Sequence, residues 1–339
     1  MRLAMLAPMA WRTPPRHYEP WGQVVANLTD GLVQLGVDVT LYATGDSGTQ
    51  AELRSVVARG YEEDAPYDVK VVEALHIARV FEETDQFDLI HSHFDFLPLM
   101  WSRLVATPMV ATIHGFSSAG ILPAYRAYDD RVHYVAISMA DRRPDLTYVA
   151  MIHHDIDLDA FPYRPNPDPD GHVLFFGRIH PDKGAADAIE IARIAERPIV
   201  LAGIIQDQGY FESEVRPRLG PQAACIGPVG GSERAALLGS AAALLHPIAF
   251  EEPFGLSVIE TMACGTRVMA YRRGWMPELI QDGVNGFLVH GLDEAVAALG
   301  KLGTRERKAC RADVEARFSS ARMVAEYAAV YDHILRGER

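Results

Sequence analysis

Short apolar runs alternate with longer amphipathic stretches over the whole chain. The runs in the first half lie at 3–7, 37–42, 88–91, 109–112, 134–137 and 148–152, and those in the second half at 173–176, 199–202, 223–226, 241–245, 268–270 and 286–289. Short apolar runs without polar alternation are typical of parallel strands, which are buried on both faces. Their alternation with helical patterns, clearest at 24–35, 185–195, 256–265 and 320–335, predicts an α/β fold.

A proline-rich segment near the middle of the chain separates these elements into two sets. Residues 163–171 (YRPNPDPDG) carry three prolines at alternate positions, which is typical of a linker. We therefore expect two doubly wound, Rossmann-like domains facing each other across a cleft, at 1–163 and 164–319. The helix at about 320–339 is a candidate to pack back on the first domain. In such sheets, ligands bind beyond the carboxyl ends of the strands.

Composition restricts the classes of partner and cofactor. The net charge of −13 disfavours nucleic acid and anionic membranes as partners. No run approaches the roughly 20 apolar residues of a membrane span, so stable membrane insertion is not expected. Three widely spaced cysteines without metal-site spacing indicate a reducing cytoplasm. No G-x-G-x-x-G follows a predicted strand, which disfavours a nicotinamide or flavin cofactor.

Candidate chemistry concentrates between residues 246 and 265 (HPIAFEEPFGLSVIETMACG). Glu252 lies on the loop before the predicted helix, and Glu260 lies about one turn inside it. The amides near Gly255 and Leu256 are expected to point out of the helix N-terminus, where a phosphate would be favoured. The two carboxylates would accept hydrogen bonds from neutral hydroxyls. A sugar nucleotide offers both a phosphate for the amides and hydroxyls for the carboxylates. Taken alone, each glutamate could equally be a residue that interacts favourably with the helix dipole, or a solvated residue on the helix surface.

Two further loops carry polar groups at predicted strand ends. The segment FFGRIHPDKG brings Arg178 and Lys183 to a strand–helix turn, where two cations could neutralise a diphosphate, although basic residues are also common on solvated loops. His114, in TIHGF, could donate a hydrogen bond to a sugar hydroxyl, or could be a structural histidine. His91 and His93 lack a third ligand at metal-site spacing, so no metal site is expected.

The string EPFGLSVIE resembles the E-x7-E signature of the retaining, GT-B-fold nucleotide-sugar glycosyltransferases of family 4. GRIHPDKG resembles the G-R-x-x-x-x-K-G element of the same family, and TIHG resembles its T-x-H-G element. The resemblance covers the chain from the first strand to the last helix and is closer in the second domain. Two departures stand out: Trp21–Gly22 replaces the usual pair of glycines, and His154–Asp155 replaces an Asn–Gly turn.

The resemblance implies a GT-B fold and a role for each matching residue. Glu260 would bind the ribose hydroxyls, Glu252 with the amides of Phe254, Gly255 and Leu256 would hold the donor sugar, and His114 would lie at the anomeric side. Arg178 and Lys183 would stabilise the leaving diphosphate. Backbone groups near Gly203 and Val229 would contact the nucleobase, and Gly22 would let backbone approach a phosphate.

The activity so implied is a cytoplasmic, metal-independent, retaining glycosyl transfer without a cofactor. The expected donor is a nucleoside-diphosphate sugar, UDP-linked as is most common in the family. The first domain would contact a small-molecule or oligosaccharide acceptor, and size and overall pattern suggest a natural-product pathway of the orthosomycin antibiotic kind.

Three other interpretations stay open. A nucleotide-sugar epimerase on the same fold would use similar donor contacts and form product without an acceptor. A phosphorylase-like enzyme would need a cofactor lysine, which nothing in the second domain marks. A non-catalytic nucleotide- or carbohydrate-binding protein is disfavoured by the presence of Arg178 and Lys183 together with both glutamates.

Overall fold

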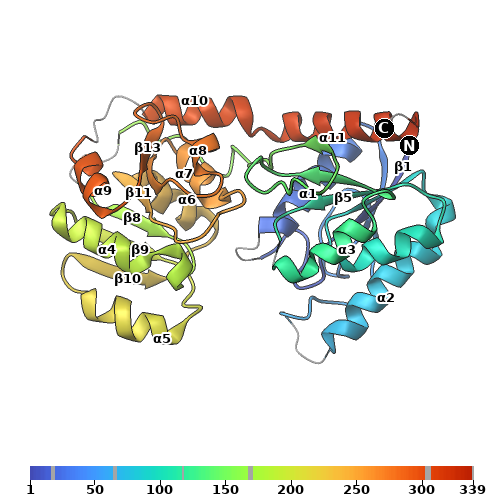
Figure 1. Cartoon of the computed structure of the whole chain (residues 1–339), viewed down its shortest axis with the longest axis horizontal. Helices are drawn as coiled ribbons and strands as arrows, with labels where there is room; N and C mark the ends of the chain where they lie inside the picture. Colours follow the sequence, from blue (N-terminus) through green and yellow to red (C-terminus); the bar gives the residue numbers. More distant parts are fainter. Residues whose placement is uncertain (17–19, 64–66, 117, 167–170, 302–306, 338–339) are drawn as a thin grey trace. The chain divides into compact units, whose positions relative to one another are not determined.

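The computed structural model describes residues 1–16, 20–63, 67–116, 118–166, 171–301 and 307–337. The chain divides into two compact units, each built around a parallel sheet with helices against it (Figure 1). Unit 1 consists of Met1–Asp155 and Ser320–Arg339, and unit 2 consists of Ile156–Ser319. The prediction of two Rossmann-like domains is confirmed.

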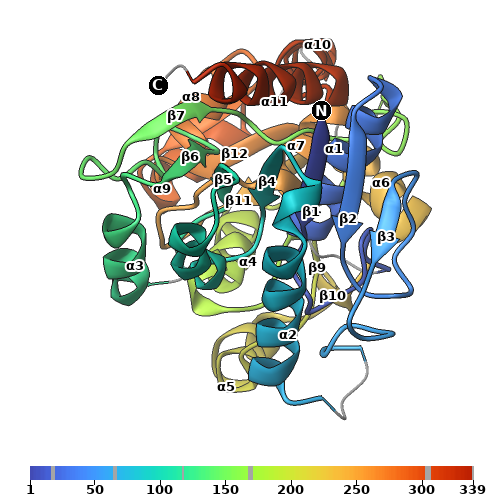
Figure 2. The ribbon, with the colours of Figure 1, turned by 90° about the vertical axis from the view of Figure 1, so that its right-hand side faces the viewer.

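Unit 1 contains a seven-stranded parallel sheet with the order β3-β2-β1-β4-β5-β6-β7. Its strands are β1 (Arg2–Leu6), β2 (Asp38–Tyr42), β3 (Glu52–Arg54), β4 (Leu89–Ser92), β5 (Met109–Ile113), β6 (Val132–Ala136) and β7 (Tyr148–Met151). Figure 2 shows β1, β2 and β3 next to one another on one side of this sheet. The strand order reverses between β1 and β4, which is the position where doubly wound sheets bind ligands.

The helices of unit 1 include one from the far end of the chain. They are α1 (Pro20–Gln34), α2 (Val69–Glu82), α3 (Leu122–Ala127) and α11 (Ser320–Leu335), with 3-10 turns at Thr84–Gln86, Leu97–Leu104 and Ala119–Ile121. Helix α11 packs closely on α1, since a Cβ on Gly31 would lie 2.4 Å from a methyl of Val324. The hydroxyls of Tyr327 and Tyr331 bond Thr112 and His91, which ties α11 to the end of the sheet.

Unit 2 contains a six-stranded parallel sheet with the order β10-β9-β8-β11-β12-β13. Its strands are β8 (Val173–Phe176), β9 (Ile199–Ala202), β10 (Ala223–Gly227), β11 (Ala243–His246), β12 (Arg267–Tyr271) and β13 (Gly286–Val289). This order matches the Rossmann order 3-2-1-4-5-6, with the reversal between β8 and β11. The loops after β8 and β11 are therefore the expected place for a ligand in this unit.

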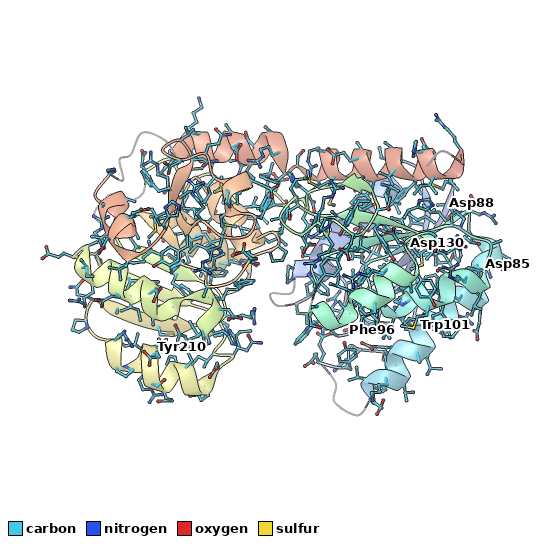
Figure 3. The ribbon with its side chains drawn as sticks, in the orientation of Figure 1. Asp85, Asp88, Phe96, Trp101, Asp130 and Tyr210 are labelled. Atoms are coloured by element: carbon cyan, nitrogen blue, oxygen red, sulfur yellow. The ribbon has the colours of Figure 1, made fainter. Side chains whose placement is uncertain are left out.

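The main helices of unit 2 are α4 (Ala185–Ile194), α6 (Gly231–Ser240), α7 (Leu256–Ala263), α9 (Leu292–Leu299) and α10 (Arg307–Arg317). Shorter turns are Pro181–Lys183, α5 (Gln208–Tyr210), Phe211–Val215, Arg216–Arg218 and α8 (Met276–Leu279). The Tyr210 hydroxyl, labelled in Figure 3, accepts a hydrogen bond from the Ala186 amide at 2.9 Å and so joins α5 to α4. No described helix is both long enough and apolar enough to span a membrane.

The division between the units lies earlier than the predicted boundary at 163/164. The Ile156 amide donates to the Phe318 carbonyl at 3.0 Å, and Arg311 donates to the Phe161 carbonyl at 2.8 Å. The segment before the proline-rich stretch therefore belongs with unit 2. Prolines mark where the chain cannot continue a regular element, whereas the boundary depends on which surface the segment packs against. Residues 167–170 of the expected linker lie outside the described residues.

Candidate functional site

The loops after β8 and β11 meet at the point where the strand order of unit 2 reverses. Gly184, with φ of 74°, lies so close to the second loop that a Cβ there would stand 2.0 Å from the Pro247 carbonyl oxygen. The Ala249 amide also donates to the Asp182 carbonyl at 2.7 Å. These backbone contacts bring Lys183 and Glu252, which are 69 positions apart in sequence, to one place.

Lys183 and Glu252 form a largely buried ion pair. The Lys183 ammonium donates to Glu252 Oε2, with side-chain exposures of 16% and 11%. The ammonium also lies 4.6 Å from the centre of the Phe250 ring. An isolated charge at such a site would be costly, so each side chain offsets the cost of burying the other.

His246 adds a third polar group, one to which the sequence interpretation gave no role. It is the last residue of β11, and its Nε2 lies 4.0 Å from Glu252 Oε2, which is too far for a hydrogen bond. Burial, with a further contribution from Lys183, lowers the pKa of His246 to about 3. The imidazole is therefore neutral at pH 7 and adds no positive charge to the pair.

The backbone around Glu252 is held by a third loop. The Trp275 amide donates to the Glu252 carbonyl at 2.9 Å, and a Cβ on Gly274 would lie 2.3 Å from the Glu252 amide nitrogen. Phe254 stacks on the buried Trp275 with ring centres 4.3 Å apart. This packing fixes the chain that leads into α7, whose N-cap is Gly255 with φ of 81°. Leu256 begins the helix, so its amide is among those without an intrahelical acceptor.

Glu260, one turn inside α7, faces a cation that sequence reasoning missed. Arg234 of α6 donates to Glu260 Oε2, with side-chain exposures of 12% and 10%. The guanidinium also lies 5.2 Å from the centre of the Phe176 ring and 5.6 Å from that of Phe161. In the segment 231–240 (GSERAALLGS), Arg234 follows Glu233 directly, and nothing in this local pattern indicated a buried partner on another helix.

Arg178 and Gly203 lie at adjacent strand ends. A Cβ on Gly203 would stand 1.8 Å from the Gly177 carbonyl oxygen, so the turns after β8 and β9 touch at a position that only glycine fits. Arg178 is exposed and donates to Gln206 Oε1. Val229 lies half-buried in the loop between β10 and α6, at the next strand end along this side of the sheet. The structure thus places Arg178, Gly203 and Val229 at three neighbouring strand ends of one sheet.

His114 lies in unit 1, at the end of β5, and its ring is enclosed by other aromatic rings. Its Nε2 is 2.9 Å from His93 Nδ1, and its Nδ1 is 3.1 Å from His154 Nε2. Trp21, beside the buried Gly22 on α1, stacks on the His114 ring with centres 5.2 Å apart. Burial lowers the pKa of His114 to about 3, so the ring is neutral at pH 7.

Histidines are numerous here, yet their geometry is not that of a metal site. His91 bonds the hydroxyls of Thr112 at 2.8 Å and Tyr331 at 2.7 Å. Within the described part of the chain, no group of three or more His, Cys, Asp or Glu residues is arranged to hold a metal ion.

Comparisons with known proteins agree with this architecture. Residues 22–143 match the model of Glycosyltransferase Family 4, and residues 170–303 match that of Glycosyl transferases group 1. The chain is 27% identical to a D-inositol 3-phosphate glycosyltransferase of Mycolicibacterium paratuberculosis, over 89% of this chain and 80% of that protein.

Two solved structures show the same fold. AviGT4, a glycosyltransferase involved in avilamycin A biosynthesis, is 24% identical with a TM-score of 0.71, over 99% of this chain and 98% of AviGT4. Anabaena HepE, solved in complex with UDP and glucose, is 18% identical with a TM-score of 0.74, over 98% of this chain and 99% of HepE. Family models of glycosyltransferases match both units, and the chain therefore belongs to the GT-B glycosyltransferases of the group 1/family 4 kind.

Proposed function

We propose that the protein is a retaining, metal-independent glycosyltransferase that takes a sugar from a nucleoside-diphosphate donor, UDP-linked, and passes it to a small-molecule or oligosaccharide acceptor. One observation carries the proposal: two buried carboxylate–cation pairs and Arg178 lie around the switch point of the sheet in unit 2. The presence of UDP in the HepE structure supports the choice of nucleotide.

The proposed binding of the donor is an exchange of partners. The diphosphate takes over Lys183 and adds Arg178, which frees the Glu252 carboxylate to accept hydrogen bonds from the donor sugar. Glu260 accepts from the ribose hydroxyls while Arg234 balances its charge. The cations then stabilise the diphosphate as it leaves, a preorganised electrostatic contribution of the kind that often dominates catalysis. His114 would approach the anomeric side of the sugar.

The compartment and the class of acceptor are also part of the proposal. The cysteines Cys225, Cys264 and Cys310 are free thiols, which suits a reducing cytoplasm. The likeness to AviGT4 motivates the proposal of an antibiotic-type acceptor, to be tested by product analysis with candidate glycosides.

Calorimetric titration with UDP, GDP, ADP and dTDP, each with and without EDTA, tests the donor site. We expect one nucleotide to bind, with an affinity that EDTA leaves unchanged and that Arg178→Ala lowers by about tenfold or more. Arg218→Ala, in an exposed ion pair with Glu214 of the same unit, is the matched control. Absence of nucleotide binding, or binding that needs a divalent ion, would overturn the proposal.

Glu252→Gln separates transfer from its alternatives. Loss of transfer with retained UDP binding supports the role of the carboxylate at the sugar. In the wild-type protein, product formed from the donor without acceptor would instead indicate an epimerase, and UDP binding without any turnover would indicate a non-catalytic protein.

A further inference from the structure

His246 is a buried polar side chain of unit 2 to which the proposed function gives no role. It ends β11, beside the switch point of the sheet, and is only 4% exposed. Its Nε2 atom is fully buried and has no hydrogen-bond partner among the described residues. Buried polar atoms are nearly always paired, so an unpaired nitrogen at this position indicates a partner that it bonds in another state of the site.

The Glu252 carboxylate has two basic neighbours in the part of the chain that the structure describes. Lys183 and His246 are the basic side chains within 4.0 Å of it, and both approach the same oxygen, Oε2. Lys183 bonds that oxygen, whereas His246 Nε2 lies 4.0 Å away, beyond hydrogen-bond distance. Because the imidazole is neutral at pH 7, it can offer Glu252 a hydrogen bond but not a charge.

The backbone around these side chains is fixed, but the carboxylate itself can turn. The Ala249 amide donates to the Asp182 carbonyl at 2.7 Å, and the Trp275 amide donates to the Glu252 carbonyl at 2.9 Å. A hydrogen bond of ordinary length, about 2.9 Å, would require the carboxylate and the imidazole to approach each other by about 1 Å. Rotations about the side-chain bonds of Glu252 supply such a movement without any shift of the backbone.

Donor binding, as proposed above, removes the ammonium from Glu252. The diphosphate takes over Lys183, and a carboxylate with 11% side-chain exposure is left without its cation, which is costly. His246 Nε2 is the nearest remaining nitrogen of a basic side chain among the described residues. An N–H on Nε2 points its positive end at the carboxylate, whereas a bare lone pair there would face a negative charge. Electrostatics therefore favours the tautomer that carries the proton on Nε2.

We propose that His246 is a positioning residue: when the diphosphate draws Lys183 away, the His246 Nε2–H group donates to Glu252 Oε2 and holds the carboxylate in place for the donor sugar. This inference rests on the proposed transferase function. The carboxylate is then bonded in both states, by Lys183 in the free protein and by His246 in the donor complex. His246 acts only through Glu252, so it should matter only while residue 252 carries a charge.

Calorimetric titration of the full chain with UDP tests this dependence. We expect His246→Leu to weaken UDP binding about tenfold or more, because a hydrogen bond to a buried charge is lost. In the Glu252→Gln background, which has no carboxylate to hold, the same substitution should change UDP binding by less than about twofold. His246→Gln keeps an N–H near the position of Nε2 and should stay within about threefold of the wild type.

His172→Leu is the matched control. His172 is another histidine of unit 2 whose buried Nε2 has no partner among the described residues, but it precedes β8 at the opposite end of the sheet. Its replacement should leave UDP affinity unchanged. Equal losses from His246→Leu in the wild-type and Glu252→Gln backgrounds would indicate a merely structural role and overturn the inference, while the proposed function would stand. Absence of UDP binding to the wild type would instead remove the proposed function.

Nitrogen-15 NMR of the histidine-labelled wild-type protein tests the exchange without relying on a stable variant. We expect His246 at pH 7 to be neutral with its proton on Nε2. Saturating UDP should move that N–H signal to higher frequency, as formation of a hydrogen bond to a carboxylate does, and should leave the His172 signals in place. A His246 that lacks a proton on Nε2 in the UDP complex, or whose signals do not respond to bound UDP, would overturn the inference.

Discussion

The buried pair between Arg234 and Glu260 gives the sharpest prediction about stability. Both side chains are about nine-tenths buried, with exposures of 12% and 10%. Arg234→Met removes the cation and leaves the Glu260 carboxylate without its partner. Breaking a fully buried pair in this way costs about 3–5 kcal/mol. Because a shorter side chain admits some water, we expect a loss of about 3 kcal/mol in the free energy of unfolding.

The reverse substitution should cost less, because the two partners differ in their other contacts. In Glu260→Gln the guanidinium remains over the rings of Phe176 and Phe161, at 5.2 and 5.6 Å, and the amide oxygen still accepts a hydrogen bond. Cation–π contacts of this kind contribute about 0.5–1 kcal/mol each. We therefore expect a loss of about 1–2 kcal/mol for this variant.

Urea unfolding of the nucleotide-free protein, followed by circular dichroism, measures both effects. The double variant should be more stable than the sum of the single losses predicts, by about 2 kcal/mol, because it buries no unpaired charge. Arg216→Met is the control: its partner is Glu212, both side chains are exposed, and the change should stay within about 0.5 kcal/mol. The reasoning would be refuted if the losses of the two single variants added up to the loss of the double variant. It would also be refuted if the Arg234→Met variant were as stable as the Arg216→Met control.

Three further predictions concern acid, glycine and a buried arginine. Burial lowers the pKa of His114 to about 3, so below pH 6.5 the unfolded chain binds a proton that the folded chain does not. As the pH falls, this group should lower the free energy of unfolding by about 1.4 kcal/mol per pH unit. A urea midpoint that does not change between pH 6.5 and 5 would contradict this prediction. Gly184→Ala should destabilise by more than about 2 kcal/mol in calorimetry, whereas Gly220→Ala, where a Cβ meets nothing within 4 Å, should be close to neutral. Arg307→Met should cost about 3 kcal/mol in urea unfolding, because its guanidinium donates to the carbonyls of residues 164, 239, 241 and 264; a loss under 1 kcal/mol would contradict that role.

The sequence predicted the strands of both sheets well because buried parallel strands are nearly continuous apolar runs. It did not predict β3 (Glu52–Arg54), a three-residue edge strand that is only partly buried and has no apolar run. Helix α2 (Val69–Glu82) was also not identified, and its apolar residues do not keep to one face: Val71 and Leu75 are exposed while Val72 is buried. Patterns predict elements where burial is uniform and fail where an element lies at an edge.

The residues of the candidate site likewise fall into those that the sequence could identify and one that it could not. The resemblance singled out Glu252, Glu260, Arg178 and Lys183, since each lies in a short motif that can be found without a structure. Arg234 could not be found this way, because it contacts Glu260 from another helix, 26 positions away. Its role depends on how α6 packs against α7, and no local spacing encodes that packing.

The two departures from the family pattern meet at one residue. Trp21, where a glycine is usual, stacks on the His114 ring, and His154, where an asparagine is usual, bonds the Nδ1 atom of the same ring. Asp155, the other changed residue of that turn, accepts from Asn27 of α1, the helix that carries Trp21. Because these positions are 133 residues apart and converge on a single imidazole, the changes are best explained together. The two departures therefore shape the surroundings of the His114 ring, and replacing either Trp21 or His154 should change the orientation of that imidazole.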